Sequence, residues 1–320
     1  MQTNERLKIV KNNAVEIVSE DELKKLIEEK EHPIVYCGYE PSGPIHIGHL
    51  VTITKLIEFQ KADFHVKVLF ADWHAWLNHK GDWEKIEKET NSWKKGFQAA
   101  GLNAEFVIGT TFQKNELYFE DILKMSRKLT INRTLRSMQQ VARNKENATV
   151  SQMIYPLMQI EDIKKMDIDV ATGGMEQRKI HMLAREILPE IGYKSPICIH
   201  TGLISSLVNK GKMSSSDPAS MISIIDSDEE IKRKIKKAYC PEGIEKENPI
   251  LEITKLIIFP QVSRLNITRK EEFGGNLTYE HYSDLKEDFI SKKLHPMDLK
   301  AAVSSELTKI IGKIREAYKK

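Results

Sequence analysis

The stretch IVYCGYEPSGPIHIGH, residues 34–49, decides the expected fold. Its first part, Ile34 to Tyr39, is rich in β-forming residues and predicts a strand. The prolines and the glycine of residues 41–44 predict a turn, and a helical periodicity runs from Ile47 to Gln60. The stretch therefore predicts a strand, a turn and a helix in succession.

The same alternation extends in both directions along the chain. A helix is expected over residues 16–30, where Ser19 and Glu22 have capping-box spacing. Further strands are expected at residues 65–71, 104–108, 167–171 and 196–200, and helices at residues 83–100, 116–165 and 176–188. The pattern predicts an α/β fold with a Rossmann-like parallel sheet, whose ligands bind beyond the carboxyl ends of the strands.

The C-terminal third of the chain has a different pattern. Strand signals become scarce after Ser220, and mainly helices are expected from Asp226 onward, including a last one that starts at Pro296. A length of 320 residues suits about two domains. We therefore expect one domain over residues 1–220 and a mainly α-helical one over residues 221–320.

The composition is that of a globular protein rather than a membrane protein. Charged residues make up 30% of the chain, and no apolar run approaches the roughly 20 residues of a membrane-spanning helix. The first residues carry charges where a secretory signal needs an apolar segment, so a cytoplasmic protein is expected. The three cysteines form no C-x-x-C pattern. The net charge of +3 neither requires nor excludes a nucleic-acid partner.

The sequence His46-Ile47-Gly48-His49 lies where the predicted helix begins. A helix N-terminus presents free backbone N–H groups and a partial positive charge, Gly48 lets a ligand come close, and the histidines add donors. These features suit an anion. Helix capping and metal binding are the alternatives for the two histidines.

A second candidate is GKMSSSD, residues 211–217, which has neither helical nor strand periodicity. A lysine followed by three hydroxyls can meet a polyphosphate with one charge and several donors. Viewed by itself, such a segment is more often a solvated loop.

A third candidate lies in the helix expected around residues 151–165. Tyr155, Gln159 and Asp162 occur at i, i+4 and i+7, which places three polar groups on one helix face. Composition alone favours a solvent-facing stripe.

Taken together, H-I-G-H and K-M-S-S-S around an α/β domain resemble the two signatures of the class I aminoacyl-tRNA synthetases. Three segments further resemble the tyrosyl-tRNA synthetases of archaeal and eukaryal type: YCGYEPSG (residues 36–43), IYPLMQ (residues 154–159) and GGMEQRKIH (residues 173–181). The resemblance extends to HPMDLK at residues 295–300. It implies a ligase that activates L-tyrosine with ATP and transfers it to the 3′ end of tRNA(Tyr).

The resemblance also implies a tyrosine site. In that family the residues that match Tyr36 and Asp162 hold the phenol of the substrate. Those that match Tyr155, Gln159 and Gln177 hold its amino-acid backbone, and the residue that matches His74 lies close to the pocket. A phenol can donate to a carboxylate and accept from a hydroxyl, so this pair suits tyrosine on chemical grounds as well. The implied tyrosine-binding residues are Tyr36, Gly38, His74, Tyr155, Gln159, Asp162 and Gln177.

The resemblance assigns ATP, with Mg²⁺ carried by it, to the first two candidates. Catalytic roles are implied for His46, His49 and Lys212. Many members of the class have a second lysine where this chain has Ser215, which leaves open how that charge is replaced. No permanently bound cofactor is expected. The implied ATP-binding residues are Gly48, Lys212, Met213, Ser214, Ser215 and Ser216.

The RNA side is implied by the same resemblance. Arg136, Arg178 and Lys179 match positions near the acceptor end, and Phe273 and Asp298 match positions that meet the anticodon. Any one basic stretch is more often a solvated helix face. The family is homodimeric, and residues 116–138 are where we expect the interface. Residues 1–220 would then bind ATP and tyrosine, and residues 221–320 the anticodon.

Three alternatives stay open. A tryptophanyl-tRNA synthetase shares the fold and the signatures, and Asp162 could accept an indole N–H, although the pair with Tyr36 suits a phenol better. A non-charging, synthetase-like RNA-binding protein is disfavoured by the intact histidines and lysine. An adenylate-forming enzyme that needs no tRNA is disfavoured by the helical C-terminal region.

Overall fold

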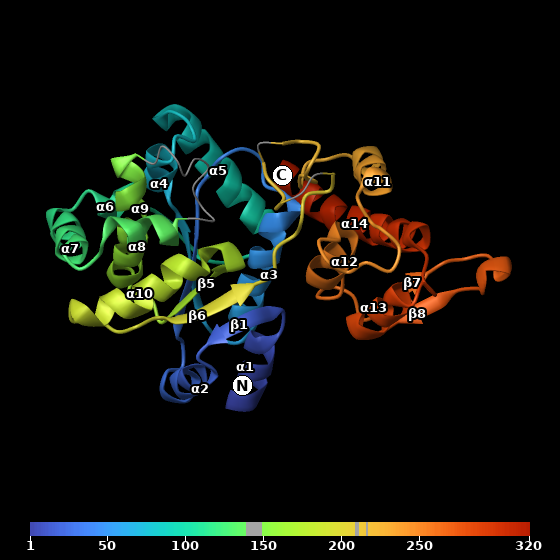
Figure 1. Cartoon of the computed structure of the whole chain (residues 1–320), viewed down its shortest axis with the longest axis horizontal. Helices are drawn as coiled ribbons and strands as arrows, with labels where there is room; N and C mark the ends of the chain where they lie inside the picture. The colour runs from blue at the N-terminus through green and yellow to red at the C-terminus, as the bar shows by residue number, and fades with distance from the viewer. Residues whose placement is uncertain (139–148, 209–210, 216) are drawn as a thin grey trace. The chain divides into compact units, whose positions relative to one another are not determined.

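The computed structural model describes residues 1–138, 149–208, 211–215 and 217–320 (Figure 1). Its contacts divide the chain into two compact units. The first unit comprises residues 1–42, 55–94 and 101–202, and the second comprises residues 43–54, 95–100 and 203–320. The chain thus enters the second unit twice before residue 203. The division expected at residue 220, with its assignment of functions, stays a prediction.

The first unit is built on a six-stranded sheet (Figure 1). In spatial order its strands are β1 (Ala14–Val18), β6 (Ile197–Thr201), β5 (Val170–Gly174), β2 (Ile34–Tyr39), β3 (His65–Phe70) and β4 (Glu105–Ile108). All neighbours are parallel except β1, which pairs antiparallel with β6. The predicted α/β fold with a Rossmann-like parallel sheet is confirmed.

The order of the strands locates the place where a ligand is expected. From β2 the chain proceeds outward through β3 and β4, and then returns to the other side of β2 through β5 and β6. The carboxyl ends of β2 and β5 therefore flank a switch point, where open parallel sheets bind their ligands. Tyr39 and Gly174 end these two strands.

Helices cover this sheet and supply most of its core. In the first unit they are α1 (Thr3–Lys11), α2 (Glu20–Glu29), α4 (Asp72–Leu77), α6 (Thr110–Gln113), α7 (Glu116–Ser126), α8 (Ile131–Ser137), α9 (Val150–Lys165), the short helix η1 (Met175–Gln177) and α10 (Arg178–Glu190). Helices α3 (Ile47–Lys61) and α5 (Trp83–Ala99) contribute residues to both units. Helices α7, α8 and α10 pack against α9 (Figure 1), where Tyr118, Ile160 and Ala184 are fully buried.

Two expected elements are placed differently in the structure. Residues 16–18, expected to be helical, belong to β1, and α2 begins only after Ser19, whose side chain accepts a hydrogen bond from the N–H of Glu22. Pairing with β6, which is remote in sequence, explains why periodicity could not reveal this strand. The strand expected at residues 167–171 lies at residues 170–174, because Asp167 has a φ of 54° and Ile168 N–H bonds back to Ile163 at the end of α9.

The second unit is mainly helical, as expected. It contains α11 (Asp228–Lys237), α12 (Pro249–Ile253), the π-helical turn η2 (Thr254–Ile258), the short helix η3 (Glu271–Phe273), α13 (Tyr282–Ile290) and α14 (Pro296–Lys319). A small hairpin of β7 (Leu265–Ile267) and β8 (Leu277–Tyr279) was not expected, because three-residue strands carry too little pattern. Helix α14 buries Val303, Leu307 and Ile311 and packs on α11. None of the described helices has the length and apolarity needed to cross a bilayer.

Candidate active site

Asp162 and Tyr36 are deeply buried polar residues near the switch point. Asp162, on α9, is 0% exposed, and Tyr36, on β2, is 1% exposed. Oδ1 of Asp162 accepts hydrogen bonds from Tyr118 Oη at 2.7 Å and from Gln113 Nε2 at 2.9 Å. Within the described part of the chain, Asp162 Oδ2 and Tyr36 Oη have no hydrogen-bond partner. An unsatisfied buried polar atom costs about 1–3 kcal/mol, so these two atoms favour a ligand that supplies both a donor and an acceptor.

Burial controls the ionisation of these groups. It raises the pKa of Asp162 to about 7, against the opposing hydrogen bonds from Gln113 and Tyr118. Burial, together with the nearby Asp162 carboxylate, raises the pKa of Tyr36 well above its ordinary value. Burial lowers the pKa of His74 to about 3, so this histidine is neutral near pH 7. Its Nε2 lies 3.6 Å from Asp162 Oδ2, too far for a hydrogen bond.

The remaining expected tyrosine-site residues lie around this pair. The ring of Tyr155 meets the ring of His74 edge-on, with centroids 4.6 Å apart. Gln159 donates to the side-chain oxygen of Gln177 at 3.2 Å. A Cβ added to Gly38 would lie 3.5 Å from the Tyr36 ring, which is an ordinary contact. The first unit thus gathers polar groups from β2, α4, α9 and η1 at the carboxyl ends of its central strands.

Four residues of this candidate site were not predicted from the sequence. Two follow the carboxyl ends of strands, a position that could have revealed them. Glu40 follows β2 and accepts from Asn78 Nδ2 at 3.2 Å, and Asp72 follows β3 and accepts from the hydroxyl of Thr110 at 2.5 Å. The other two, Gln113 and Tyr118, hold Asp162 from positions with no distinctive pattern.

The second unit contains the H-I-G-H residues in a compact arrangement. The His46 N–H donates to His49 Nδ1 at 3.2 Å, the Gly48 N–H donates to His46 Nδ1 at 3.1 Å, and the two rings stack 3.9 Å apart. Because each Nδ1 accepts a hydrogen bond, the proton of each neutral ring lies on Nε2. Burial, with the Lys212 charge, lowers the pKa of His46 to about 4, and burial, with His46 and Lys212 nearby, lowers the pKa of His49 well below its ordinary value. Both rings are therefore neutral donors at pH 7.

The K-M-S-S-S segment lies beside these histidines within the same unit. A Cβ added to Gly48 would lie 2.9 Å from the His46 ring and 4.0 Å from Met213 Cβ. One added to Gly43, whose φ is +82°, would lie 3.4 Å from Ser215 Cβ. The first motif is fixed by two backbone hydrogen bonds, Ile47 N–H to Ile222 O and Ile224 N–H to Ile45 O, of 2.9 and 3.1 Å. Ser214 is half-buried and Lys212 exposed, whereas Ser216 lies outside the described residues.

The surroundings of the α3 N-terminus contain the elements that an anion-binding site needs. They combine the N-terminus of α3, two neutral N–H donors, one lysine and several hydroxyls. In the described ranges, no three His, Cys, Asp or Glu side chains are grouped to hold a metal ion. Helix capping by the histidines is seen in part, since Gly48 N–H donates to His46.

Comparison with known proteins decides the family. The model of the tRNA synthetases class I (W and Y) matches residues 28–312. This chain belongs to that family.

Relatives of this synthetase cover it along nearly its whole length. The Tyrosine–tRNA ligase of Archaeoglobus fulgidus is 48% identical over 319 residues, covering 99% of this chain and 98% of the relative. That of Methanopyrus kandleri is 47% identical over 320 residues, with the same coverage. The crystal structure of the Archaeoglobus fulgidus tyrosyl-tRNA synthetase complexed with L-tyrosine matches with a TM-score of 0.94, over 99% of this chain and 100% of that one. The tryptophanyl-tRNA synthetase of Aeropyrum pernix, at 20% identity and a TM-score of 0.74, shares the fold.

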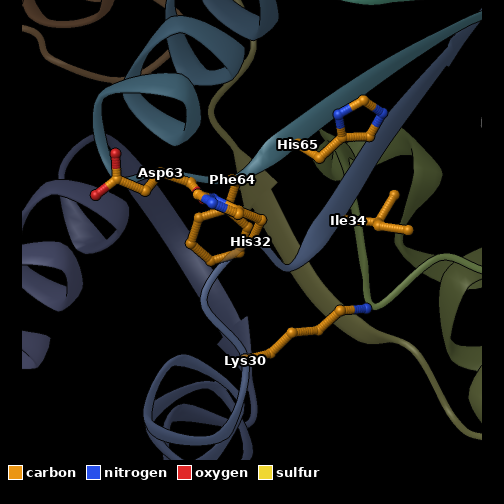
Figure 2. Close-up of a pocket in the computed structure, with 6 residues that line it drawn as sticks. All are labelled: Lys30, His32, Ile34, Asp63, Phe64 and His65. Atoms are coloured by element: carbon orange, nitrogen blue, oxygen red, sulfur yellow. The ribbon is translucent and has the colours of Figure 1, made fainter.

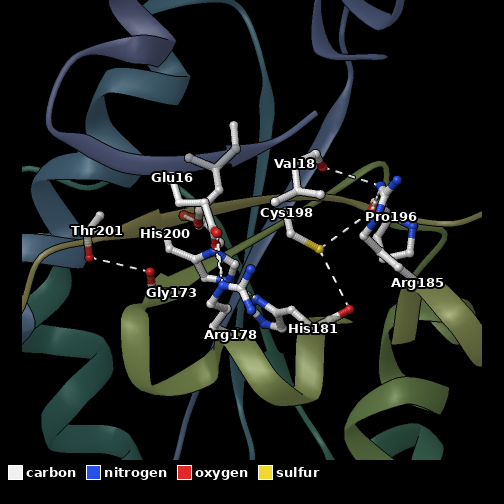
Figure 3. Close-up of polar contacts among 12 residues, drawn as sticks. Glu16, Val18, Gly173, Arg178, His181, Arg185, Pro196, Cys198, His200 and Thr201 are labelled. Carbon is white, nitrogen blue, oxygen red and sulfur yellow. Dashed lines mark hydrogen bonds and ion pairs between the residues drawn. The ribbon is translucent and has the colours of Figure 1, made fainter. Parts of the chain in front are cut away.

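The residues expected to contact tRNA occupy varied settings in the synthetase. Figure 3 shows the carboxylate of Glu16 pointing toward Arg178 and His200. Arg178 Nε donates to both Glu16 oxygens, at 2.9 and 2.8 Å, and His200 Nδ1 lies 2.9 Å from the same carboxylate. Arg136 is exposed on α8, and Lys179 is half-buried on α10. In the second unit, Phe273 is 63% exposed, and Asp298 lies half-buried in the first turn of α14.

A surface hollow of about 440 Å³ lies at the opposite ends of the strands (Figure 2). Ile34 and His65, which begin β2 and β3, line it together with Lys30, His32, Asp63 and Phe64. Nζ of Lys30 forms an ion pair with Oδ2 of Asp169 at 2.6 Å. None of the expected site residues borders this hollow.

Proposed function

We propose that this chain is a tyrosine–tRNA ligase, which activates L-tyrosine with ATP and transfers the tyrosyl group to the 3′ end of tRNA(Tyr). The main observation behind this proposal is that two buried atoms, Asp162 Oδ2 and Tyr36 Oη, lack a hydrogen-bond partner among the described residues. The relatives named Tyrosine–tRNA ligase that cover 99% of the chain support the same conclusion.

The phenol of tyrosine suits this pair of atoms. Its hydrogen is donated to Asp162 Oδ2, and its oxygen accepts the hydrogen of Tyr36 Oη. Phenylalanine would leave both protein groups unpaired, and tyrosyl-tRNA synthetase is itself the standard example of rejection by this means. The indole of tryptophan has a donor but no acceptor for Tyr36, which disfavours the tryptophan alternative.

Activation requires no nucleophile from the protein. A carboxylate oxygen of tyrosine attacks the α-phosphorus of ATP, a new P–O bond forms, and the bond to pyrophosphate breaks. Positioning and charge stabilisation carry such transfers. We assign these tasks to the Nε2–H groups of His46 and His49, to Lys212, and to the hydroxyls of Ser214, Ser215 and Ser216. A ribose hydroxyl of the terminal tRNA nucleotide then attacks the tyrosyl carbonyl, and AMP leaves.

Mg²⁺ enters this scheme as an ion bound to the ATP phosphates. Phosphate-bound Mg²⁺ keeps several waters and needs few protein ligands. Without a second lysine in the segment, Lys212 and the N-terminus of α3 are the positive elements that the described residues supply on the phosphate side. We accordingly expect weaker pyrophosphate retention than a two-lysine segment would give.

tRNA(Tyr) is the proposed macromolecular partner, in the cytoplasm. Arg136, Arg178 and Lys179 are assigned to the acceptor end, and Phe273 and Asp298 to the anticodon, with residues 221–320 as the anticodon-binding domain. The 63% exposure of Phe273 supports a role in stacking on an unpaired base. We also assign Tyr155, Gln159 and Gln177 to the amino-acid backbone of the substrate tyrosine. Gly38 and His74 are assigned to the walls of the tyrosine site.

A homodimer is proposed on the basis of an exposed apolar surface. Leu117, Leu123 and Ile131, on α7 and α8, are 59%, 65% and 71% exposed. Large apolar side chains exposed on neighbouring elements are the kind of surface that an interaction site buries. These residues lie on the helices expected to form the interface.

One assay pair tests the proposed function against its alternatives. ATP–pyrophosphate exchange is measured with each standard amino acid, and charging is then measured with bulk tRNA. We expect exchange with tyrosine, little with phenylalanine or tryptophan, and charging of a tyrosine acceptor. Absence of exchange with any amino acid would favour the non-charging RNA-binding protein. Exchange without charging would favour an enzyme independent of tRNA.

A further inference from the structure

Glu252 makes an unusual contact in the second unit. It lies on α12, and both of its carboxylate oxygens accept hydrogen bonds from a single residue, Ser205. The backbone N–H of Ser205 donates to Oε2 at 2.6 Å, and its hydroxyl donates to Oε1 at 3.0 Å. Charge-assisted bonds of this kind are about twice as strong as neutral ones.

Ser205 in turn lies opposite Lys212. The two residues form an antiparallel β-bridge, and Met213 N–H donates to Ile204 O at 3.0 Å. Ser206 N–H also donates to Gly211 O at 2.8 Å. Backbone hydrogen bonds to residues 204–206 therefore hold the chain in place on both sides of Lys212.

The helix that carries Glu252 is firmly anchored. Ile250, Leu251 and Ile253 are each at most 1% exposed. The side chain of Asn248 caps the helix by accepting from the N–H groups of Ile250 and Leu251. The position of the Glu252 backbone is thus fixed by the core of the second unit.

We propose that Glu252 is a positioning residue for the ATP step, which holds Ser205 and thereby sets the place of Lys212. The proposal rests on the proposed function, in which Lys212 meets the phosphates of ATP. Glu252 itself contacts no reacting atom. Its carboxylate is occupied by the two Ser205 donors and links α12 to the K-M-S-S-S segment.

The kinetic test compares Glu252→Ala with Glu316→Ala, a control that removes an exposed glutamate from α14. Pyrophosphate exchange is measured with full-length protein, together with the affinity for tyrosine. We expect Glu252→Ala to lower kcat by about tenfold or more, because small displacements of a positioning group have effects of this size. Tyrosine affinity and the control should stay within about twofold of the wild type. An unchanged kcat in Glu252→Ala would overturn the proposal.

Coupling to Lys212 separates positioning from a merely structural role. In a Lys212→Ala background, adding Glu252→Ala should cost less than about twofold, since the residue being positioned is already gone. If the kcat of the double variant falls by the product of the two single-variant losses, the proposal is overturned. Ser205→Ala, which removes only the hydroxyl bond, should give an intermediate loss and serves if Glu252→Ala fails to fold.

Cleavage by trypsin after Lys212 provides a readout independent of activity. In the absence of substrates, the Glu252→Ala variant should release the fragment beginning at Met213 faster than the Glu316→Ala control. If Lys212→Ala itself leaves kcat unchanged, the proposed role of Lys212 fails, and the cleavage rates then decide whether Glu252 holds the segment. Equal cleavage in both variants would contradict the proposal whatever the kinetics.

Discussion

Tyr118 donates its phenolic hydrogen to Oδ1 of Asp162 over 2.7 Å. The same hydroxyl lies 2.9 Å from the carbonyl oxygen of Met158, one turn earlier on the same face of α9. With Oδ1 engaged, Oδ2 is the oxygen that remains for a ligand. Tyr118 therefore orients the carboxylate that we assign to the phenol of the substrate.

Removing this hydroxyl should weaken the discrimination between tyrosine and phenylalanine. For Tyr118→Phe we expect a loss of about fivefold in the ratio of the two kcat/KM values, because one hydrogen bond to a charged group contributes about 1 kcal/mol or more. Asp162→Ala should abolish most of the preference. The control is Tyr193→Phe, which removes a phenol bonded to the more exposed Asp167. Retained discrimination in Asp162→Ala would mean that the phenol is recognised elsewhere.

Tyrosine binding should depend on pH around neutrality. Because burial raises the pKa of Asp162 to about 7, the free carboxyl is mostly protonated at pH 6 and mostly ionised at pH 8. The phenol donates to the ionised form, so kcat/KM for tyrosine should rise about tenfold between these values.

Other buried groups allow this pH profile to be assigned. Burial lowers the pKa of His74 to about 3 and raises that of Glu161 to about 8, so Glu161 could contribute in the same range. Asp162→Asn should flatten the profile, whereas Glu161→Gln should leave it in place. A profile that follows Glu161 instead would refute the assignment.

Lys212→Ala should slow adenylate formation. The lysine is proposed to stabilise charge on the phosphates during transfer, so kcat should fall by about a hundredfold with tyrosine affinity unchanged. Pyrophosphate exchange at saturating ATP measures this. An exposed lysine of the same unit, Lys313, supplies the control. An unchanged kcat would remove Lys212 from the mechanism.

Arg178 should affect charging but not activation. Nε of Arg178 donates hydrogen bonds to both carboxylate oxygens of Glu16, which fix the orientation of the guanidinium (Figure 3). Arg178 is half-buried. We expect Arg178→Ala and Glu16→Gln to raise the KM for tRNA about three- to tenfold, with exchange kinetics unchanged. The matched control is Glu22→Gln, which loosens the similar pair with Arg185. Equal tRNA kinetics in all three would exclude Arg178 from the RNA surface.

Leu123, an exposed apolar residue of α7, should determine the oligomeric state. Leu123→Glu places a charge on a residue that is 65% exposed in one chain, so folding should be unaffected and association lost. Light scattering of the purified variant tests this. A monomeric wild type would contradict the proposed homodimer.

The α/β fold with a parallel sheet and the mainly helical C-terminal region could be predicted from the sequence. Residues 34–49 made this possible because strand, turn and helix signals follow directly in that stretch. Strand β1 could not be predicted, because its partner β6 lies far along the chain. Tyr118 was missed for a similar reason: its bond to Asp162 joins residues 44 positions apart, and on its own helix it has the spacing of a core aromatic.

The lowered pKa values of the stacked pair His46 and His49, the first buried and the second half-buried, have a further consequence for turnover. Two imidazolium ions would attract the pyrophosphate product with full charges and slow its departure. Neutral N–H donors contribute most where charge accumulates during the reaction, and little to retaining a product. The electrostatic hold on the nucleotide then falls mainly to Lys212 and one helix terminus. We therefore expect a shallow dependence of ATP affinity on ionic strength, and release of pyrophosphate that does not limit the cycle.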